Sequence, residues 1–226
     1  LSFAMKEFEV PKNRNTWLKE IGNLRERFES ESFKVGLEEK GRISIYDFVD
    51  KLSDGFSGDE IIVTGSSGLA IEVFYTHFRN RAGQWIGLTT GLGAMGYGLP
   101  SLLGVAAASK NKVYLFESDG SLMMNLQELQ SLKTLGHPVT IFVQNNDGYA
   151  SIRATQENYF SGRFVGTGPS SKLEIPSFKM VAQSFGFEYM SISGLGGITD
   201  KISKAISDQG LLICEIFLRR DEKLMP

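Results

Sequence analysis

The sequence predicts an α/β fold: a mainly parallel central sheet with helices on both faces, which makes a three-layer sandwich. From residue 58 onward, short apolar and β-branched runs alternate with helical segments, the pattern of repeated βαβ units. The runs are almost continuously apolar, as is typical of strands that are covered on both faces. Glycine accounts for 25 of 226 residues and is concentrated in the turns that follow these runs.

The individual elements follow from apolar periodicity and from breaker residues. Ser44 is a candidate N-cap for a helix that continues to residue 52. Strands are expected at 61–64, 85–88, 113–116, 139–143, 189–193 and 211–218. Helices are expected at 16–28, 69–78, 100–109, 125–135, 176–185 and 199–207. The long irregular stretch 161–175 is either a functional lid or a missed element.

Composition excludes several classes of protein. The charge is balanced at −2, from 24 basic and 26 acidic residues, so the electrostatic signature of a nucleic-acid binder is absent. A single cysteine cannot form a disulfide within the chain, and it favours a reducing compartment. No apolar run approaches the ~20 residues that cross a bilayer, and the N-terminus lacks a signal-peptide pattern. We therefore expect a cytoplasmic location, and the first residue, Leu1, suggests a cut fragment.

One glycine cluster allows two interpretations. Residues 91–96 read Gly-Leu-Gly-Ala-Met-Gly, and Glu117 follows 21 residues after Gly96, which matches the spacing of a dinucleotide-binding fingerprint. Against this, the preceding strand is weak, and Pro100 suggests that the helix starts only there. The alternative is that the glycines simply let the loop pack closely against a helix.

A second cluster predicts a cation site. Asp119 follows one predicted strand, and Asn146 follows the next strand, 27 residues later. A crossover helix between them places both residues at the carboxyl ends of parallel strands, where open α/β sheets bind ligands. Carboxylate and amide oxygens suit Mg²⁺, which also binds substrate phosphates. The backbone N–H groups of Gly120 and Ser121 could face a diphosphate, although each motif alone is also ordinary turn chemistry.

These motifs carry a family resemblance. Ser118–Ser121 with Asn145-Asn146 resembles the thiamine-diphosphate motif, and the segments 91–100, 122–129 and 145–156 fit the same family. The chain resembles the C-terminal diphosphate-binding domain of acetolactate-synthase-like decarboxylases and carboligases over most of residues 40–218. The resemblance implies that residues 36–218 are the thiamine-diphosphate-binding domain. It also implies that 1–35 are the tail of a preceding central domain or a linker, and that 219–226 are a truncated, solvated C-terminal tail.

The resemblance also implies roles for particular residues. The metal ligands would be Asp119, Asn146 and the backbone carbonyl of Gly148, and the cofactors would be thiamine diphosphate and Mg²⁺. Gly120 and Ser121 would meet the diphosphate, with Gly65, Ser66 and Ser67 at a second phosphate turn and Tyr149 also at the cofactor. Met95 would support the bent cofactor beneath its thiazolium ring, and the carbonyl of Gly93 would accept from the aminopyrimidine. Asn145 would stabilise the loop, and Arg153 would face either substrate or solvent.

Three departures from the family pattern bear on function. Ser118 replaces the first glycine of the motif, and Thr155 stands where acetolactate synthases carry tryptophan, which puts acetolactate as the product in doubt. The activating glutamate of the family belongs to a pyrimidine-binding domain, so the expected partner is that domain of the same enzyme or of a second subunit in a homo-oligomer. The chain alone would be inactive, and its substrate would be a 2-oxoacid. The alternatives are an NAD(P)-dependent oxidoreductase that uses residues 91–96, and a non-catalytic binding remnant.

Overall fold

We analysed a computed structural model, which describes residues 14–32, 40–65, 68–88, 91–220, 222 and 224. The chain divides into two compact units, Leu1–Leu37 and Glu38–Pro226. The first unit contains helix α1 (Asn15–Ser32), which exposes the apolar side chains of Trp17 and Leu24. The assignment of residues 1–35 to the tail of a preceding domain stays a prediction. The second unit contains the sheet and the candidate site.

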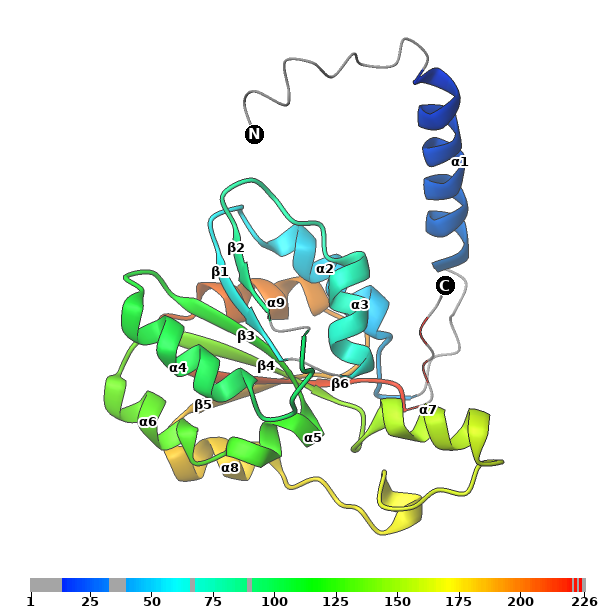
Figure 1. Ribbon diagram of the computed structural model, residues 1–226. Helices are drawn as coiled ribbons and strands as arrows, with labels where there is room; N and C mark the ends of the chain where they lie inside the picture. Colours follow the sequence, from blue (N-terminus) through cyan, green and yellow to red (C-terminus); the bar gives the residue numbers. More distant parts are fainter. Residues whose placement is uncertain are drawn as a thin grey trace. The chain divides into compact units, whose positions relative to one another are not determined.

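Six parallel strands form one sheet in the order β2-β1-β3-β4-β6-β5 (Figure 1). The strands are β1 (Ile61–Thr64), β2 (Trp85–Gly87), β3 (Val113–Ser118), β4 (Val139–Asn145), β5 (Glu188–Ile192) and β6 (Leu211–Phe217). The predicted α/β class with a parallel central sheet is confirmed. Strands β3 and β4 occupy the two central positions of this order, so they lie side by side in the middle of the sheet.

Helices cover both faces of the sheet. On one face lie α2 (Ile45–Gly55), α3 (Leu69–His77) and α9 (Ile198–Ser207), and on the other lie α4 (Gly98–Ala108), α6 (Glu128–Leu135) and α8 (Phe178–Phe185) (Figure 1). Successive side chains of a strand point to opposite faces. Phe116 of β3 therefore packs in the first layer, whereas the adjacent Leu115 packs in the second. Two buried layers account for the continuous apolar character of the strands.

Aromatic rings fill the first layer beneath the central strands. Phe116 lies between Phe74 and Phe142, with ring centroids 4.7 Å and 5.0 Å apart. Phe48 of α2 packs against Phe142 at 5.9 Å. All four rings are fully buried, and such pairs stabilise a core beyond the area that they bury. This packing fixes β3 and β4 relative to α2 and α3, and so fixes the strand ends that carry the site.

Local signals predicted some helix boundaries and missed others. Ser44 caps α2 as predicted, because its side chain accepts a hydrogen bond from the Tyr46 N–H. The sequence placed the start of helix α4 at Pro100, but the helix begins two residues earlier, at Gly98. The segment expected as a turn forms the short helix α5 (Asp119–Leu122) and the 3₁₀ turn η2 (Met123–Asn125), and α6 begins only at Glu128. Short helical turns of this kind carry no apolar periodicity to detect.

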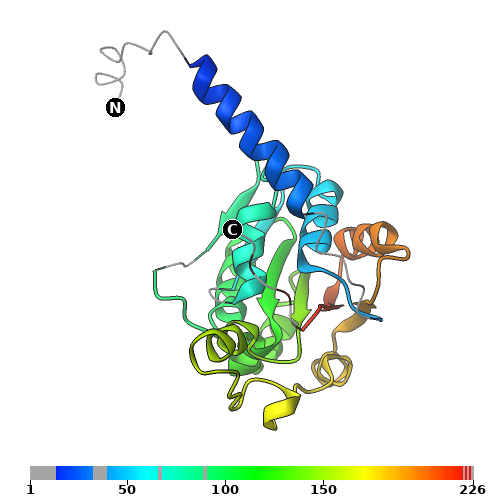
Figure 2. The same ribbon diagram turned by 90° about the vertical axis from the view of Figure 1, so that its right-hand side faces the viewer.

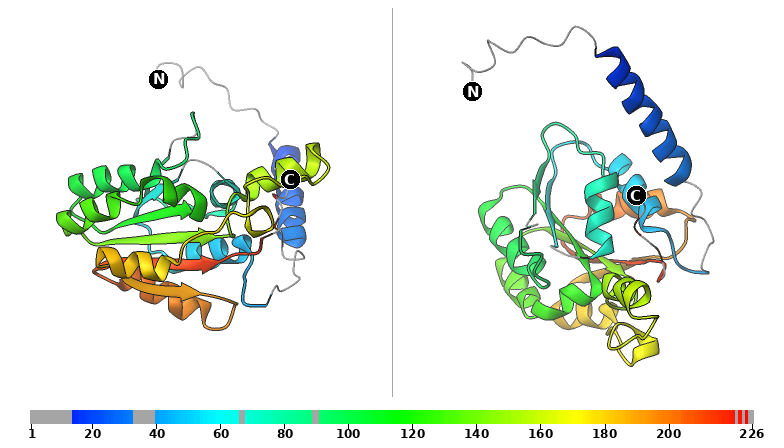
Figure 3. Two further views of the ribbon diagram at one scale, coloured as in Figure 1. Left: turned by 90° about the horizontal axis from the view of Figure 1, so that it is seen from below. Right: turned by 45° about the vertical axis from the view of Figure 1, so that its right-hand side comes forward.

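One helix was missed entirely. Helix α7 (Ala150–Tyr159) contains no buried residue, so its sequence lacks the apolar stripe by which a core-facing helix is found. The following stretch contains only the 3₁₀ turn η3 (Pro169–Ser171). Figures 2 and 3 show α7 and this stretch beside the layered body. In the segment expected as a solvated tail, Arg220 is exposed, yet both Arg220 and Glu222 form hydrogen bonds with the body of the domain.

In the part of the chain that the structure describes, no helix combines the length and apolar character needed to span a bilayer.

We expect the ammonium group of Lys112 to make a measurable contribution to stability. Its Nζ donates to three carbonyls at the end of α9: Ala205 and Ile206 at 3.0 Å and Asp208 at 2.5 Å. Replacing Lys112 with Met removes the ammonium donor from all three carbonyls. Ala205 and Ile206 keep hydroxyl donors, from Thr140 and Tyr114, each at 3.0 Å. Because bonds to a charged donor are lost, we expect the free energy of unfolding to fall by about 2 kcal/mol. Urea unfolding followed by circular dichroism measures the change. Lys110→Met, at a neighbouring exposed position, is the control and should change little.

Candidate functional site

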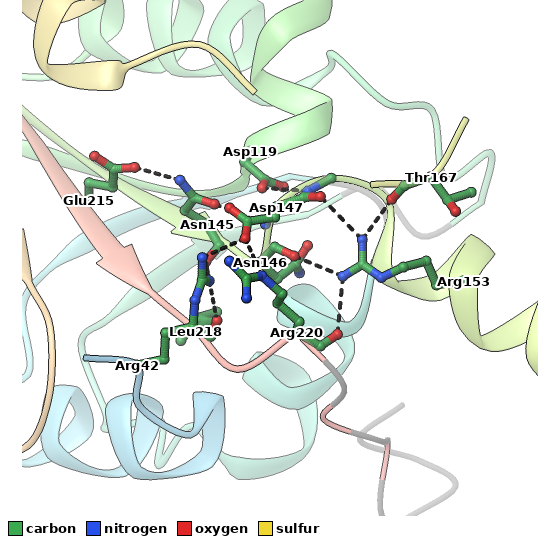
Figure 4. A network of polar contacts seen from close by, with 11 residues as sticks. Arg42, Asp119, Asn145, Asn146, Asp147, Arg153, Thr167, Glu215, Leu218 and Arg220 are labelled. Atoms are coloured by element: carbon green, nitrogen blue, oxygen red, sulfur yellow. Dashed lines mark hydrogen bonds and ion pairs between the residues drawn. The ribbon is translucent and has the colours of Figure 1, made fainter. Parts of the chain in front are cut away.

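The carboxyl ends of β3 and β4 bring Asp119 and the segment Asn145–Gly148 together (Figure 4). One carboxylate oxygen of Asp119 accepts from the Gly120 N–H at 2.8 Å. The other accepts from the Gly148 N–H at 2.9 Å, across 29 residues of sequence. We call Asn145–Gly148 the β4 loop. The two motifs that the sequence places on adjacent strands are thus in direct contact.

Burial dominates the electrostatics of Asp119. The side chain is fully buried, and the loss of hydration raises the pKa of its carboxyl to about 7. The N–H groups of Gly148 and Gly120 and the charge of Arg153 lower this pKa in part. A carboxylate in this environment is costly to ionise without a further positive partner.

Asn146 supplies a second oxygen with unmet bonding capacity. The residue is buried, and its Oδ1 has no hydrogen-bond partner among the described residues. A buried polar atom without a partner costs free energy unless a ligand or ion satisfies it. The described residues contain no cluster of three or more His, Cys, Asp or Glu side chains. One carboxylate with one amide oxygen is instead the sparse oxygen set that suits Mg²⁺ with a bound phosphate.

The β4 loop has a backbone shape that only certain residues tolerate. Asp147 has φ 60° and Gly148 has φ 122°, and aspartate is among the few non-glycine residues that adopt the left-handed region readily. A Cβ atom at Gly148 would lie 2.7 Å from the carbonyl oxygen of Thr167. Gly148 is therefore required both for its φ and for the close approach of the Thr167 backbone.

The glycine loop 91–98 is tied to the Asp119 turn. The Gly96 N–H donates to the Ser121 hydroxyl at 2.8 Å, and the Asn125 side-chain amide donates to the Gly96 carbonyl at 2.8 Å. Gly96 has φ 84°, and a Cβ there would meet Asn125 at 2.9 Å. The loop presents Met95, which is 37% exposed. These contacts hold Gly96, the residue after Met95, against the turn that carries Asp119.

The structure rejects the dinucleotide interpretation of residues 91–96. That interpretation needs Glu117 to bind a ribose, but Glu117 is fully buried. A Cβ at Gly65 or at Gly98 would lie 2.1 Å from a carboxylate oxygen of Glu117, so the side chain fills the space between these two glycines. Burial also raises the pKa of Glu117 to about 7. The Glu117 carboxylate thus lies against the backbone of Gly65 and Gly98, and it does not project into an open site beside the glycine loop.

The structure describes some of the remaining predicted site residues and not others. Gly65 lies at the end of β1 and donates its N–H to the Phe116 carbonyl at 2.6 Å, whereas Ser66 and Ser67 lie outside the described residues. The Tyr149 ring packs on Gly120, where a Cβ would lie 2.4 Å from the ring. The Tyr149 N–H donates to the Thr167 carbonyl at 3.0 Å. Tyr149 thus covers the backbone of the Asp119 turn.

Several residues around the β4 loop were not predicted to touch it. They are Arg42, Glu215 and Arg220, which come from three distant parts of the chain (Figure 4). Arg153 faces the loop backbone through its guanidinium group, and does not fit either of the two roles expected for it. The acidic Asp147 within the predicted site loop was the available signal, because a partly buried carboxylate needs a cationic partner.

Comparison with known families now identifies the chain. Residues 64–216 match the family model described as thiamine pyrophosphate enzyme, C-terminal TPP binding domain. The chain belongs to this family. The match includes both motifs of the site, Asp119–Ser121 and the β4 loop, together with the sheet that positions them. Thiamine pyrophosphate, that is, thiamine diphosphate, is the cofactor of the family.

Curated relatives of this chain include acetolactate synthases from plants and bacteria. Acetolactate synthase 2 of Zea mays is 27% identical over 233 residues, which cover 100% of this chain and 35% of the relative. The acetolactate synthase of Arthrospira platensis is 31% identical over 149 residues, covering 66% of this chain and 25% of the relative. The large subunit from Lactococcus lactis is 25% identical, covering 100% and 38%. The chain thus spans roughly a third of the length of these relatives.

A solved structure supports the same fold. The thiamine diphosphate-dependent 4-hydroxybenzoylformate decarboxylase of Rhodococcus jostii RHA1 superposes with a TM-score of 0.71 at 19% identity. The match covers 84% of this chain and 35% of that chain. The similarity confirms the thiamine-diphosphate-binding fold predicted from the motifs.

A pair of glycine variants tests the shape of the β4 loop. Gly148→Ala places a Cβ 2.7 Å from the Thr167 carbonyl at φ 122°, whereas Gly162 has φ 71° with nothing within 4 Å. Gly162→Ala therefore measures the backbone strain alone, about 1–2 kcal/mol. We expect Gly148→Ala to lower the free energy of unfolding by more than this control. Equal losses in urea unfolding would contradict the steric argument.

The raised pKa of Asp119 predicts a pH dependence of stability. Its pKa is about 7 in the folded protein and about 4 in the unfolded chain. Between these values the folded state binds more protons, so this group lowers the free energy of unfolding as the pH rises from about 4 to about 7. Asp119→Asn removes that contribution. In EDTA, the stability of the variant relative to wild type should increase between pH 5 and pH 8; a constant difference would contradict the prediction.

Proposed function

We propose that this domain holds the diphosphate of thiamine diphosphate through Mg²⁺, as part of a 2-oxoacid decarboxylase or carboligase similar to acetolactate synthase. The cation would be held by the Asp119 carboxylate, the Asn146 side-chain oxygen and the backbone carbonyl of Gly148. The observation that carries the proposal is geometric. The buried Asp119 carboxylate, which accepts from two backbone N–H groups, lies at the same strand ends as buried Asn146 Oδ1, which has no hydrogen-bond partner among the described residues. A bound cation would satisfy both groups at once.

The turns around this pair have the features of a diphosphate cradle. Asp119 starts a short helix, and its residues Gly120 and Ser121 have no bulky side chain. We assign Gly120 and Ser121 to the diphosphate, with Gly65, Ser66 and Ser67 as the second phosphate turn and Tyr149 beside the Asp119 turn. The Ser121 hydroxyl is already engaged by the Gly96 N–H, so Ser121 would contribute through its backbone.

The glycine loop is assigned to the reactive end of the cofactor. Gly93 has φ 59° and would present its carbonyl to the aminopyrimidine. Met95 would lie under the thiazolium ring, where an unbranched, adaptable side chain is a suitable support. When bound, the cofactor supplies carbanion chemistry for decarboxylation of the 2-oxoacid, and the protein binds and orients it.

Catalysis would require a second domain. The relatives are about three times as long as this chain, and the family glutamate that activates the cofactor has no counterpart among the assigned residues. We infer that a pyrimidine-binding domain, in the same enzyme or in a second subunit of a homo-oligomer, completes the site. The chain by itself is expected to bind cofactor weakly and to be inactive.

The acceptor substrate is expected to differ from that of acetolactate synthase. Thr155 stands in place of the family tryptophan, and its hydroxyl donates to the Ser151 carbonyl at 3.0 Å within α7. Thr155 lines a cavity of about 360 Å³ beside α7, together with Ser151, Glu72 and Glu157.

Replacing Asp119 with Ala tests the metal role. Because burial of the Asp119 carboxylate costs stability in the metal-free protein, the variant should fold. We expect it to lose Mg²⁺-dependent binding of thiamine diphosphate, measured by isothermal titration calorimetry on the protein together with its pyrimidine-binding domain. Asp200→Asn, on the exposed surface of α9, is the control and should bind as wild type does. Unchanged binding by Asp119→Ala would refute the assigned ligand role.

A further inference from the structure

Three arginines from distant parts of the chain converge on the β4 loop (Figure 4). Arg42 precedes α2, Arg153 lies on α7, and Arg220 follows β6. The three side chains donate to the loop's backbone or to its single carboxylate, that of Asp147. We call Arg42, Arg153, Arg220 and Asp147 the arginine cluster. It lies on the segment that the proposed function assigns to the metal.

Arg153 binds the backbone on both sides of Asp147. Its Nη2 donates to the Asn146 carbonyl at 2.8 Å, and its Nη1 donates to the Thr167 carbonyl at 2.7 Å and to the Asp147 carbonyl at 3.3 Å. Nη2 also donates to the Arg220 carbonyl at 3.1 Å. A planar guanidinium with several fixed donors can bridge separate carbonyls in this way, whereas a lysine ammonium cannot.

Arg42 and Arg220 hold the loop through Asp147. Arg42 Nη2 donates to the Asp147 carboxylate at 2.5 Å, and the same oxygen accepts from Arg220 Nε. Arg42 Nη1 donates to the Leu218 carbonyl at 2.6 Å and to the Asn145 carbonyl at 3.3 Å. The two arginines hold the pKa of the Asp147 carboxyl below its ordinary value, against the opposing effect of burial. The cluster thus holds Asp147, the non-glycine residue of the loop that has a left-handed backbone.

The other end of the loop is fixed from the sheet. Asn145 donates from its amide to Glu215 of β6 at 2.6 Å, and its side-chain oxygen accepts from the Asp147 N–H at 2.9 Å. Glu215 also accepts from the Tyr189 hydroxyl at 2.6 Å. The carbonyls of Asn145, Asn146 and Asp147 are all engaged by arginine donors. These contacts leave Asn146 Oδ1 as the loop atom without a partner in the described structure.

We propose that Arg153, with Arg42 and Arg220, is a positioning residue that presets the β4 loop so that Asn146 and Gly148 face Asp119 before the cation binds. The inference rests on the proposed function. Its physical basis is preorganisation: the loop contains the left-handed Asp147 and Gly148, and such a backbone persists only when its surroundings determine it. Outer contacts of this kind orient the groups that bind a metal.

Charge and positioning predict opposite signs for the same variant. Burial has the largest effect on the Asp119 carboxyl and raises its pKa, and the backbone N–H groups of Gly148 and Gly120 lower it. Arg153 lies close enough to Asp119 to lower this pKa further. If Arg153 acted only as a charge, its removal would reduce repulsion of a cation and tighten Mg²⁺ binding. If Arg153 positions the loop, its removal weakens Mg²⁺ binding, because the ligands must be ordered when the cation binds.

The experiment titrates MgCl₂ into the protein together with its pyrimidine-binding domain, at saturating thiamine diphosphate, and follows the heat of binding. We expect Arg153→Met to raise the half-saturating Mg²⁺ concentration by about 10–100-fold. Arg153→Lys keeps the charge but loses the forked donors, so it should also weaken binding, by at least about tenfold. Unchanged or tighter binding in Arg153→Met overturns the inference.

The control variant removes an arginine that also forms ion pairs but does not contact the β4 loop. Arg79 donates to Asp50 and to Asp54 of α2, away from the β4 loop, so Arg79→Met should bind Mg²⁺ as wild type does. Near-ultraviolet circular dichroism checks the fold of each variant. If Arg153→Met does not fold, Arg153→Lys decides, and wild-type Mg²⁺ affinity in that variant overturns the inference. Failure of wild type to show Mg²⁺-dependent binding would instead refute the proposed function itself.

Discussion

The hydrogen bond from the Gly148 N–H to the buried carboxylate of Asp119 is the contact on which the site depends. It joins the ends of the two central strands, and it forms only if β3 and β4 are parallel neighbours. Because Asp119 is fully buried, the contact lies in a low-dielectric environment where an unpaired charge is costly. Two backbone donors satisfy part of the carboxylate, and the proposed cation would satisfy the remainder. The folding of the sheet therefore creates a buried position, at the Asp119 carboxylate, where a positive charge is favourable.

The loops around this point are fitted to one another through glycines and small polar side chains. Gly96 binds the Ser121 hydroxyl, Glu117 fills the space left by Gly65 and Gly98, and Tyr149 lies on Gly120. In each case a Cβ atom would collide with a neighbouring group. The clustered glycines of the sequence are explained by these close approaches more than by flexibility, since a rigid cradle loses less entropy when a ligand binds.

Preorganisation also explains the arginine cluster. A loop with two successive left-handed residues relaxes unless other groups hold it, and the cluster supplies donors to three consecutive carbonyls and one carboxylate. These donors come from before α2, from α7 and from the segment after β6, so the loop is determined by the whole domain. Arg220 shows that the segment directly after β6 contributes to this arrangement.

The sequence alone determined the α/β class, the six strand positions and the location of the Asp119 and Asn146 motifs at the ends of adjacent strands, because apolar runs, breaker residues and motif spacing are local properties. It placed the start of α4 two residues late, at Pro100, and the start of α6 three residues early. It missed α7, since an exposed helix has no apolar stripe. Only the tertiary structure decided that Glu117 is a packing residue and that Arg42, Arg153 and Arg220 meet at Asp147. These roles depend on contacts between residues up to 176 positions apart, and no local pattern encodes which distant arginine reaches which carbonyl.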